Sequence, residues 1–320
     1  MKKFVKNIYI IFRTVLSHIG NITRPLSDKL AIIYIDGGLS SQIFRYSMGQ
    51  YFKEMGFDVF YDVSWYQGRM ASEKKMELAI KDFVDESEMR FLGRDSFLLK
   101  KYKLLYNTAY NGMAKSAQDD ITTLKAPFCI NNYEMDWIMK SINEKRYFPW
   151  SNIERKLSDN AKEILEGIID NNVCGIHIRR GDMSYYVKGA YWKVLTPRYY
   201  EKSLDFIPKE VRKVLIFTNG IDWVKKEIIP IIEKRGYDII VVSELGLKEY
   251  EELFLLSKCN CIIASQGSWG NTALDFNSNN EVLWVKGVEH IKEEKDKFIK
   301  KYPNYEMGLF ELEDDMYLHE

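Results

Sequence analysis

Two adjacent arginines follow an apolar run in residues 177–182 (HIRRGD). The guanidinium groups of Arg179 and Arg180 present planar, bidentate donors that match the oxygens of a phosphate. Asp182 could orient one arginine or accept a proton from a substrate. A structural ion network between these charges accounts for the same residues, so the segment by itself leaves both interpretations open.

Three further loops combine glycines with small polar side chains, and each lies between an apolar run and a helical pattern. In residues 36–42 (DGGLSSQ), Gly37 and Gly38 allow a ligand to approach the backbone, and amides at a helix N-terminus favour an anion. A tight turn without a ligand explains the same glycines. The spacing is neither that of a dinucleotide-binding fingerprint nor that of a P-loop.

The other two loops place polar groups after later apolar runs. Residues 217–223 (FTNGIDW) bring Asn219 to a strand end, and residues 265–272 (SQGSWGNT) bring Ser265, Ser268 and Trp269 to the start of a helix. Hydroxyl groups and free amides at such positions suit a phosphate. Helix capping explains the serines and Asn219 without any ligand.

The elements that must position these loops alternate regularly along the chain. Apolar runs predict strands over residues 30–35, 57–61, 173–178, 214–217, 239–242, 261–264 and 282–285. Helical periodicity predicts helices over residues 43–55, 161–169, 199–206, 222–235, 249–257 and 269–276, and residues 70–150 are expected to be mostly helical. This alternation indicates an α/β fold with parallel sheets, in which ligand groups gather at the carboxyl ends of the strands.

The length of 320 residues predicts two domains. We expect a basic amphipathic segment over residues 1–30, one Rossmann-like lobe over residues 31–160, a second over residues 161–320, and a ligand cleft between the lobes.

Charge is balanced over the whole chain, with 46 Lys and Arg against 46 Asp and Glu, which argues against a nucleic-acid partner. It is segregated at the ends: residues 1–30 carry six basic side chains and one acidic one, and residues 305–320 carry six acidic side chains and no basic ones. Four cysteines are too few for a disulfide scaffold. Because no second Cys or His pair accompanies Cys259 and Cys261, we expect no metal site.

The basic N-terminal segment has an amphipathic pattern, with Phe4, Ile8, Ile11, Val15 and Ile19 spaced three or four residues apart. Its apolar run is too short for a signal peptide or a transmembrane helix. A basic amphipathic helix can lie on an anionic membrane surface, but a helix packed on its own protein has the same pattern. The two interpretations are equally well supported.

Taken together, the four loops resemble the bacterial α-1,2-fucosyltransferases of glycosyltransferase family eleven. The family's G-G-L-G-N-Q-L/M-F-Q-Y is similar to residues 37–46, its F-S-D-D-x-x-W to residues 217–223, and its N-S-S-F-S-W-W-G-A-W-L to residues 264–274. Its H-x-R-R-G-D is complete in residues 177–182. The order and spacing of these motifs agree over about residues 31–285.

The resemblance implies a GT-B-like fold and the inverting transfer of L-fucose from GDP-fucose to the 2-hydroxyl of a galactose-type acceptor, without a metal or other cofactor. Residues 31–160 would be the acceptor-side lobe and residues 161–320 the donor lobe. Arg179 would bind the diphosphate with the support of Arg180, and Asp182 is the candidate base, ahead of Asp222. The other donor-site candidates are Gly37, Gly38 and Gln42, which would shape the cleft, and His177, Asn219, Ser265, Ser268 and Trp269.

Two alternatives remain at this stage. The enzyme could transfer another GDP-deoxyhexose such as colitose, and the replacement of two aspartates by Asn219 and Gly220 would also suit a non-catalytic nucleotide-binding or glycan-binding homologue. For the enzyme we expect a role in surface polysaccharide synthesis of the O-antigen kind. A cytoplasmic location is expected, with peripheral contact to the inner face of the membrane through residues 1–22 and a glycan acceptor that could be lipid-linked.

Deleting residues 1–22 tests the membrane interpretation. We expect the truncated protein to lose association with anionic liposomes in a flotation assay, because the basic apolar face is removed, and to keep its turnover of a soluble acceptor. A truncated protein that unfolds would instead show that the segment packs on its own protein.

Overall fold

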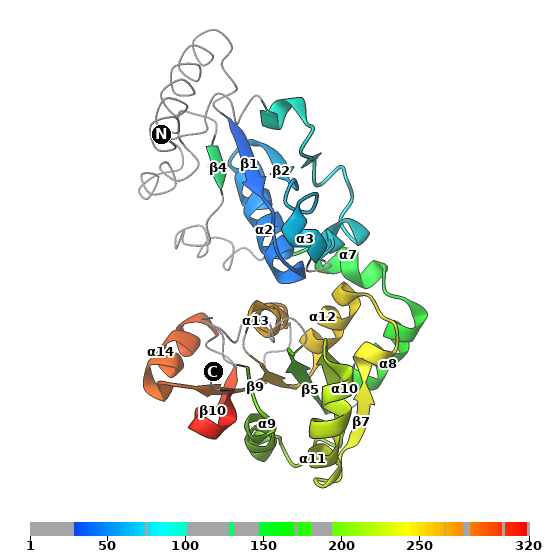
Figure 1. Cartoon of the computed structure of the whole chain (residues 1–320), viewed down its shortest axis with the longest axis vertical. Helices are drawn as coiled ribbons and strands as arrows, with labels where there is room; N and C mark the ends of the chain where they lie inside the picture. Colours follow the sequence, from blue (N-terminus) through cyan, green and yellow to red (C-terminus); the bar gives the residue numbers. More distant parts are fainter. Residues whose placement is uncertain are drawn as a thin grey trace, which may run out of the picture. The chain divides into compact units, whose positions relative to one another are not determined.

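The computed structural model describes residues 29–73, 76–100, 128–130, 147–169, 172–180, 194–265, 267–277, 282–302 and 305–318. It consists of two compact units that meet in the chain at Pro149 and Trp150 (Figure 1). Each unit contains one parallel sheet with helices, which confirms the expected α/β class. The division falls before the expected boundary at residue 160, because the helices over residues 150–155 and 159–169 both pack on the helix over residues 249–258 of the second unit.

The first unit is built on a four-stranded sheet with the order β3-β2-β1-β4. Its strands are β1 (Leu30–Tyr34), β2 (Asp58–Asp62), β3 (Phe91–Leu92) and β4 (Phe128–Ile130), and its helices are α2 (Leu39–Glu54), α3 (Arg69–Glu73) and the 3₁₀ turn η1 (Ala79–Asp82). Strand β1 pairs on both sides, with β2 and with β4, and its apolar run is buried. Helix α2 lies close to β2: a Cβ on Gly49 would come 1.8 Å from the Tyr61 hydroxyl.

Where the structure describes residues 70–150, it includes two strands in a segment expected to be mostly helical; residues 74–75, 101–127 and 131–146 lie outside the described residues. Among the described residues of this stretch, β3 extends the sheet beside β2, and β4 pairs in parallel with β1. Both strands are very short, so they carry too few residues for an apolar alternation to be recognised in the sequence.

The second unit is built on a six-stranded parallel sheet with the order β10-β9-β8-β5-β6-β7. Its strands are β5 (Val173–Ile178), β6 (Lys213–Thr218), β7 (Asp238–Val241), β8 (Cys261–Ala264), β9 (Leu283–Val288) and β10 (Glu306–Glu311). From β5 the chain builds outward through β6 and β7, then returns to the other side of β5 and builds outward through β8, β9 and β10. The sheet therefore reverses its winding between β5 and β8, and in such sheets ligands bind at the carboxyl ends of the strands at that point.

Helices cover both faces of this sheet (Figure 1). They are α7 (Trp150–Arg155), α8 (Asp159–Ile169), α9 (Pro197–Ser203), α10 (Ile221–Trp223), α11 (Ile229–Glu233), α12 (Glu249–Lys258), α13 (Ser268–Asp275) and α14 (Ile291–Lys301), with η4 (Leu204–Phe206), η5 (Val224–Ile228), η6 (Val242–Glu244) and η7 (Asp314–Met316). Buried residues of α9, η5 and α11 form one core with Cys174, Ile176 and Ile178 of β5. Helices α12 and α13 pack on the opposite face, against Gly175 and His177.

The helix expected over residues 222–235 is present but interrupted. It runs as α10, the π-helical turn η5 and then α11, and it ends at Glu233. Pro230 lies just after η5 and has no backbone N–H, so it cannot make the usual α-helical bond to the preceding turn. A local π turn at this position is the accommodation expected of such a helix.

The acidic C-terminal segment is part of the second sheet, which its charge pattern did not indicate. Strand β10 pairs in parallel with β9, buries Phe310 and exposes Glu306 and Glu311. Carboxylates on an edge strand of this kind oppose pairing with another chain.

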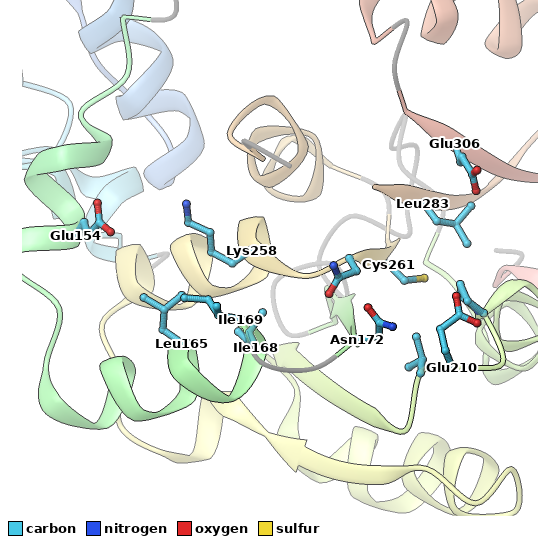
Figure 2. Close-up of a pocket in the computed structure, with 13 residues that line it drawn as sticks. Glu154, Leu165, Ile168, Ile169, Asn172, Glu210, Lys258, Cys261, Leu283 and Glu306 are labelled. Carbon is cyan, nitrogen blue, oxygen red and sulfur yellow. The ribbon is translucent and has the colours of Figure 1, made fainter. Parts of the chain in front are cut away.

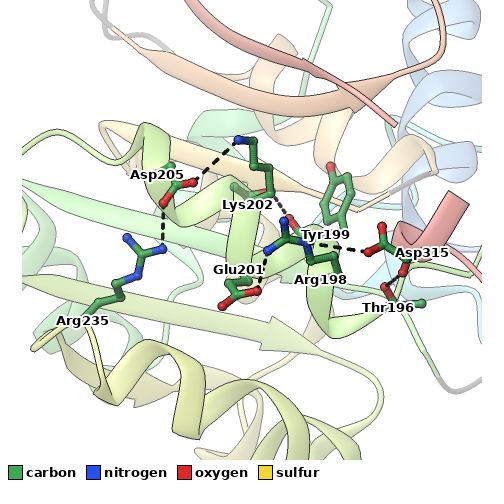
Figure 3. A network of polar contacts seen from close by, with 9 residues as sticks. Thr196, Arg198, Tyr199, Glu201, Lys202, Asp205, Arg235 and Asp315 are labelled. Carbon is green, nitrogen blue, oxygen red and sulfur yellow. Dashed lines mark hydrogen bonds and ion pairs between the residues drawn. The ribbon is translucent and has the colours of Figure 1, made fainter. Parts of the chain in front are cut away.

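The segment after β10 holds residues 194–196 in place. The backbone amide of Leu318 donates to Val194 O over 2.8 Å, and that of Thr196 donates to Met316 O over 3.0 Å. Met316 is fully buried. The Thr196 hydroxyl donates to Asp315 O over 2.6 Å, and Figure 3 shows this contact beside an exposed ion network on α9 and η4. Exposed ion pairs contribute little to stability, so we attribute the attachment of residues 194–196 to the backbone hydrogen bonds and to the burial of Met316.

Candidate functional site at the carboxyl ends of β5, β6 and β8

Three of the four loops singled out in the sequence meet at the winding reversal of the second sheet. His177, Arg179 and Arg180 lie at the end of β5, Asn219 follows β6, and Ser265 follows β8. Ser268 and Trp269 form the first turn of α13. Strand pairing places them together, since β5 pairs with both β6 and β8.

The Ser265 hydroxyl connects the ends of β5 and β8. It accepts the backbone N–H of Arg179 over 3.2 Å and lies 3.0 Å from His177 Nδ1. The tautomer of the ring decides which of these two groups donates, and a hydroxyl that accepts the amide hydrogen can still take either role. The backbone amide of Ser265 donates to His177 O over 3.0 Å, so the two loops are bonded in both directions.

Helix α13 is packed tightly on this pair. The Trp269 ring lies 4.6 Å from the His177 ring and tilts 32° to it. A Cβ on Gly270 would come 2.7 Å from Ala264 Cβ, so only glycine allows the helix to approach β8 this closely. His177 and Trp269 therefore support the site, and His177 is mostly buried, with 7% of its surface exposed.

The side chain of Arg179 lies beside the N-terminus of α13. A Cβ on Gly267, the residue that precedes α13, would be 3.0 Å from a terminal guanidinium nitrogen of Arg179. Gly267 has φ +120° and ψ 171°, a conformation that is essentially restricted to glycine. The N-terminus of a helix carries positive potential, so a cationic side chain beside it forms a site for an anion rather than for a cation.

The backbone and side chain of Arg180 contact neighbouring residues of the second unit. Its backbone N–H donates to Asn219 Oδ1 over 2.7 Å, and its guanidinium donates to Leu195 O over 3.3 Å and stands 4.3 Å from the Trp223 ring centre. Burial lowers the pKa of Arg180 from its ordinary value. These contacts agree with a supporting role for Arg180 beside Arg179.

The fourth loop, residues 36–42, belongs to the first unit and follows β1. Gly37 has φ +74°, and its carbonyl accepts the Tyr66 hydroxyl over 2.7 Å. Gln42 is fully buried: its amide nitrogen donates to Gly37 O and Glu77 O, and its amide oxygen accepts the N–H of Ile80 over 2.9 Å. Gln42 thus shapes the loop, while Gly38 precedes α2 and leaves open space beside its backbone.

The candidate base, Asp182, lies outside the described residues. Asp222, the second choice, lies on α10 and is exposed. In the part of the chain that the structure describes, no three His, Cys, Asp or Glu side chains are grouped to hold a metal ion, and no helix is long and apolar enough to span a bilayer. Cys259 is the C-cap of α12 and Cys261 begins β8, so the two cysteines do not lie on the same strand.

A cavity of about 890 Å³ lies at the opposite edge of the second sheet (Figure 2). It is lined by residues at the amino ends of the strands, among them Asn172 before β5, Cys261 of β8 and Glu306 of β10. Glu154 and Glu210 add two further carboxylates against the single charge of Lys258. Net negative charge opposes a phosphate, so this cavity does not serve the chemistry of Arg179.

Sequence reasoning missed Ser243, whose hydroxyl accepts the N–H of Thr218 at the end of β6 over 2.8 Å. A signal was present, because Ser243 directly follows the apolar run predicted as a strand over residues 239–242.

Comparison with known families gives one match: residues 151–308 match the model of Glycosyl transferase family 11. The match covers the second unit as far as β10 and includes the β5, β6 and β8 loops. The resemblance read from the motifs is thereby confirmed for this part of the chain. No curated protein matches the sequence.

Solved structures with a similar fold include three glycosyltransferases. NodZ alpha-1,6-fucosyltransferase, co-crystallized with GDP, is 10% identical with a TM-score of 0.41, over 78% of this chain and 92% of that one. FUT1 of Arabidopsis thaliana, in complex with GDP, is 13% identical with a TM-score of 0.44, over 78% and 68%. The heptosyltransferase WaaC of E. coli, with ADP, is 7% identical with a TM-score of 0.39, over 88% and 93%. These values are low, and the fold assignment rests on the strand order.

Gly267→Ala should destabilise the protein more than Gly246→Ala. Both glycines have positive φ, +120° and +71°, but nothing lies within 4 Å of a Cβ on Gly246. We expect a loss of about 1–3 kcal/mol at Gly267, from backbone strain and the displaced Arg179, and about 1 kcal/mol at Gly246. Urea unfolding of the two variants measures the difference. Equal losses would show that Gly267 is not constrained by its contact with Arg179.

Proposed function

We propose, from the match of residues 151–308 to glycosyl transferase family 11, that this protein transfers L-fucose from GDP-fucose to the 2-hydroxyl of a galactose-type acceptor with inversion. The observation that carries the proposal is the placement of Arg179 beside Gly267 and the N-terminus of α13, at the winding reversal of the sheet. The fucosyltransferases NodZ and Arabidopsis FUT1, crystallised with GDP, are consistent with this donor.

The chemistry requires that charge on the departing diphosphate be neutralised. In the proposed mechanism, Arg179 and the first amides of α13 bind the diphosphate oxygens, each charged hydrogen bond contributing about 1.5–3 kcal/mol. Ser265 and Asn219 hold the backbone of the two arginines, so the positive charge needs little reorganisation during transfer. No metal is required in this scheme, because cationic and dipolar groups supply the neutralisation.

The acceptor hydroxyl needs a base, and we assign that role to Asp182, three residues after Arg179 in the chain. Residues 31–160 would bind the acceptor. We place the reaction in surface polysaccharide synthesis on the cytoplasmic side of the membrane, with residues 1–22 contacting the lipid when the acceptor is lipid-linked.

Incubating the full-length protein with a panel of sugar nucleotides and galactose-terminated oligosaccharides, with and without EDTA, tests the reaction. We expect mass spectrometry to show one added fucose from GDP-fucose in both conditions. Transfer of another GDP-deoxyhexose would correct the donor, and loss of activity in EDTA would contradict the metal-free mechanism. Nucleotide binding without transfer or hydrolysis would indicate a non-catalytic homologue.

Arg179→Ala should lower kcat/KM for GDP-fucose by at least about 100-fold, because a preorganised cation that meets the leaving group is lost. GDP affinity, measured by calorimetry, should fall in parallel. Arg198→Ala is the matched control, since it removes an exposed arginine of the same unit that pairs with Glu201. Near-normal turnover by Arg179→Ala would contradict the diphosphate assignment.

A further inference from the structure

The backbone pairing between β6 and β7 ends before β6 does. The last pair in register is Ile216 with Val241, after which the chain of β7 turns into η6. The N–H of Thr218 therefore finds no strand carbonyl beside it. It donates to the hydroxyl oxygen of Ser243 over 2.8 Å, so a side chain completes the hydrogen bonding of the strand end.

The Ser243 hydroxyl also makes a second hydrogen bond, to a carboxylate. The hydroxyl has one hydrogen, which it donates to Glu252 Oε2 over 2.7 Å. Glu252 lies in the first turn of α12 and is largely desolvated, and this burial raises its pKa to about 7. The charged and the protonated carboxyl of Glu252 both have an oxygen that can accept this hydrogen, and the amide of a glutamine would have one as well.

Glu252 is not needed to begin α12. The neighbouring Glu251 caps that helix by accepting the N–H of Lys248 over 2.8 Å, and it also accepts the N–H of Ser158 over 2.6 Å. Glu252 instead accepts the Ser243 hydroxyl, and so connects α12 through Ser243 to the end of β6.

The end of β6 continues directly into the candidate site. The hydroxyl of Thr218 accepts the N–H of Gly220 over 3.0 Å, and Asn219 between them accepts the backbone N–H of Arg180 over 2.7 Å. A Cβ on Gly220 would come 2.7 Å from Arg180 Cβ, so a small displacement of this loop is transmitted to Arg180.

We propose that Ser243 and Glu252 are positioning residues for the donor site: they fix the end of β6 and, through Asn219, the backbone of Arg180, which is the residue next to Arg179. The inference rests on the proposed function, in that Arg179 binds the donor diphosphate with the support of Arg180. Neither residue touches the donor. Each acts through the loop formed by residues 218–220.

Four variants of the full chain test this inference. Glu252→Ala and Ser243→Ala remove the acceptor at each step, Glu252→Gln keeps it, and Glu249→Ala removes an exposed carboxylate from the same helical turn. With one loop bond lost, worth about 1 kcal/mol, we expect the two acceptor-removing variants to raise the KM for GDP-fucose and the Kd for GDP about fivefold, with a smaller change in kcat. Glu252→Gln and Glu249→Ala should stay within about twofold to threefold of the wild type.

Hydrogen exchange followed by mass spectrometry reports on the loop independently of any substrate. Peptides that contain Thr218, Gly220 and Arg180 should exchange faster in Ser243→Ala and Glu252→Ala than in Glu249→Ala. Unchanged exchange in Ser243→Ala would overturn the inference, as would a Glu252→Gln variant as impaired as Glu252→Ala. Faster exchange with an unchanged KM and Kd would also overturn it. If Glu252→Ala does not fold, Ser243→Ala decides these outcomes.

A wild-type protein that binds no GDP would contradict the proposed function. GDP binding by the wild type decides that point without any variant. The exchange measurement still decides whether Ser243 and Glu252 hold the loop formed by residues 218–220.

Discussion

The hydroxyl of Ser265 is the contact on which the candidate site depends. A doubly wound sheet must reverse direction somewhere, and at that point two neighbouring strands send their following loops apart, which opens a crevice at the sheet edge. The backbone there has polar groups that no further strand can satisfy. The Ser265 hydroxyl binds the amide of Arg179 and contacts the ring of His177, so a single side chain connects the ends of β5 and β8.

This arrangement separates two roles that the adjacent arginines could have shared. Arg180 is held in one position by its contacts with Asn219, Leu195 and Trp223. Arg179 reaches across to Gly267, where a glycine conformation leaves room for its guanidinium beside the start of a helix. Positive charge and helix amides then converge on one place, with the side chain of only one of the two arginines committed to it.

The strands that carry the site were predictable, because β5, β6 and β8 are buried on both faces and read as unbroken apolar runs. Ligand groups in such a sheet gather at the carboxyl ends of the strands, so the sequence also indicated that His177, Arg179, Asn219 and Ser265 lie near one another. Glu252 was not predictable, since a carboxylate in the first turn of an acidic helix looks like any solvated side chain. Strands β3, β4 and β10 were missed for a different reason: two are very short, and the third is an edge strand with a glutamate at each end and a glycine in its apolar stretch.

The hold of Tyr317 and Leu318 on residues 194–196 has a consequence for biosynthesis. Leu195 pairs with Tyr317 in an antiparallel bridge, and the carbonyl of Leu195 binds the guanidinium of Arg180. The ribosome makes Arg180 and Leu195 long before it makes the residues that fix them. Domains generally fold as they emerge, N-terminal parts first. The contact between the Arg180 guanidinium and Leu195 O therefore reaches its final arrangement only after β10 and the segment that follows it have been made and have folded.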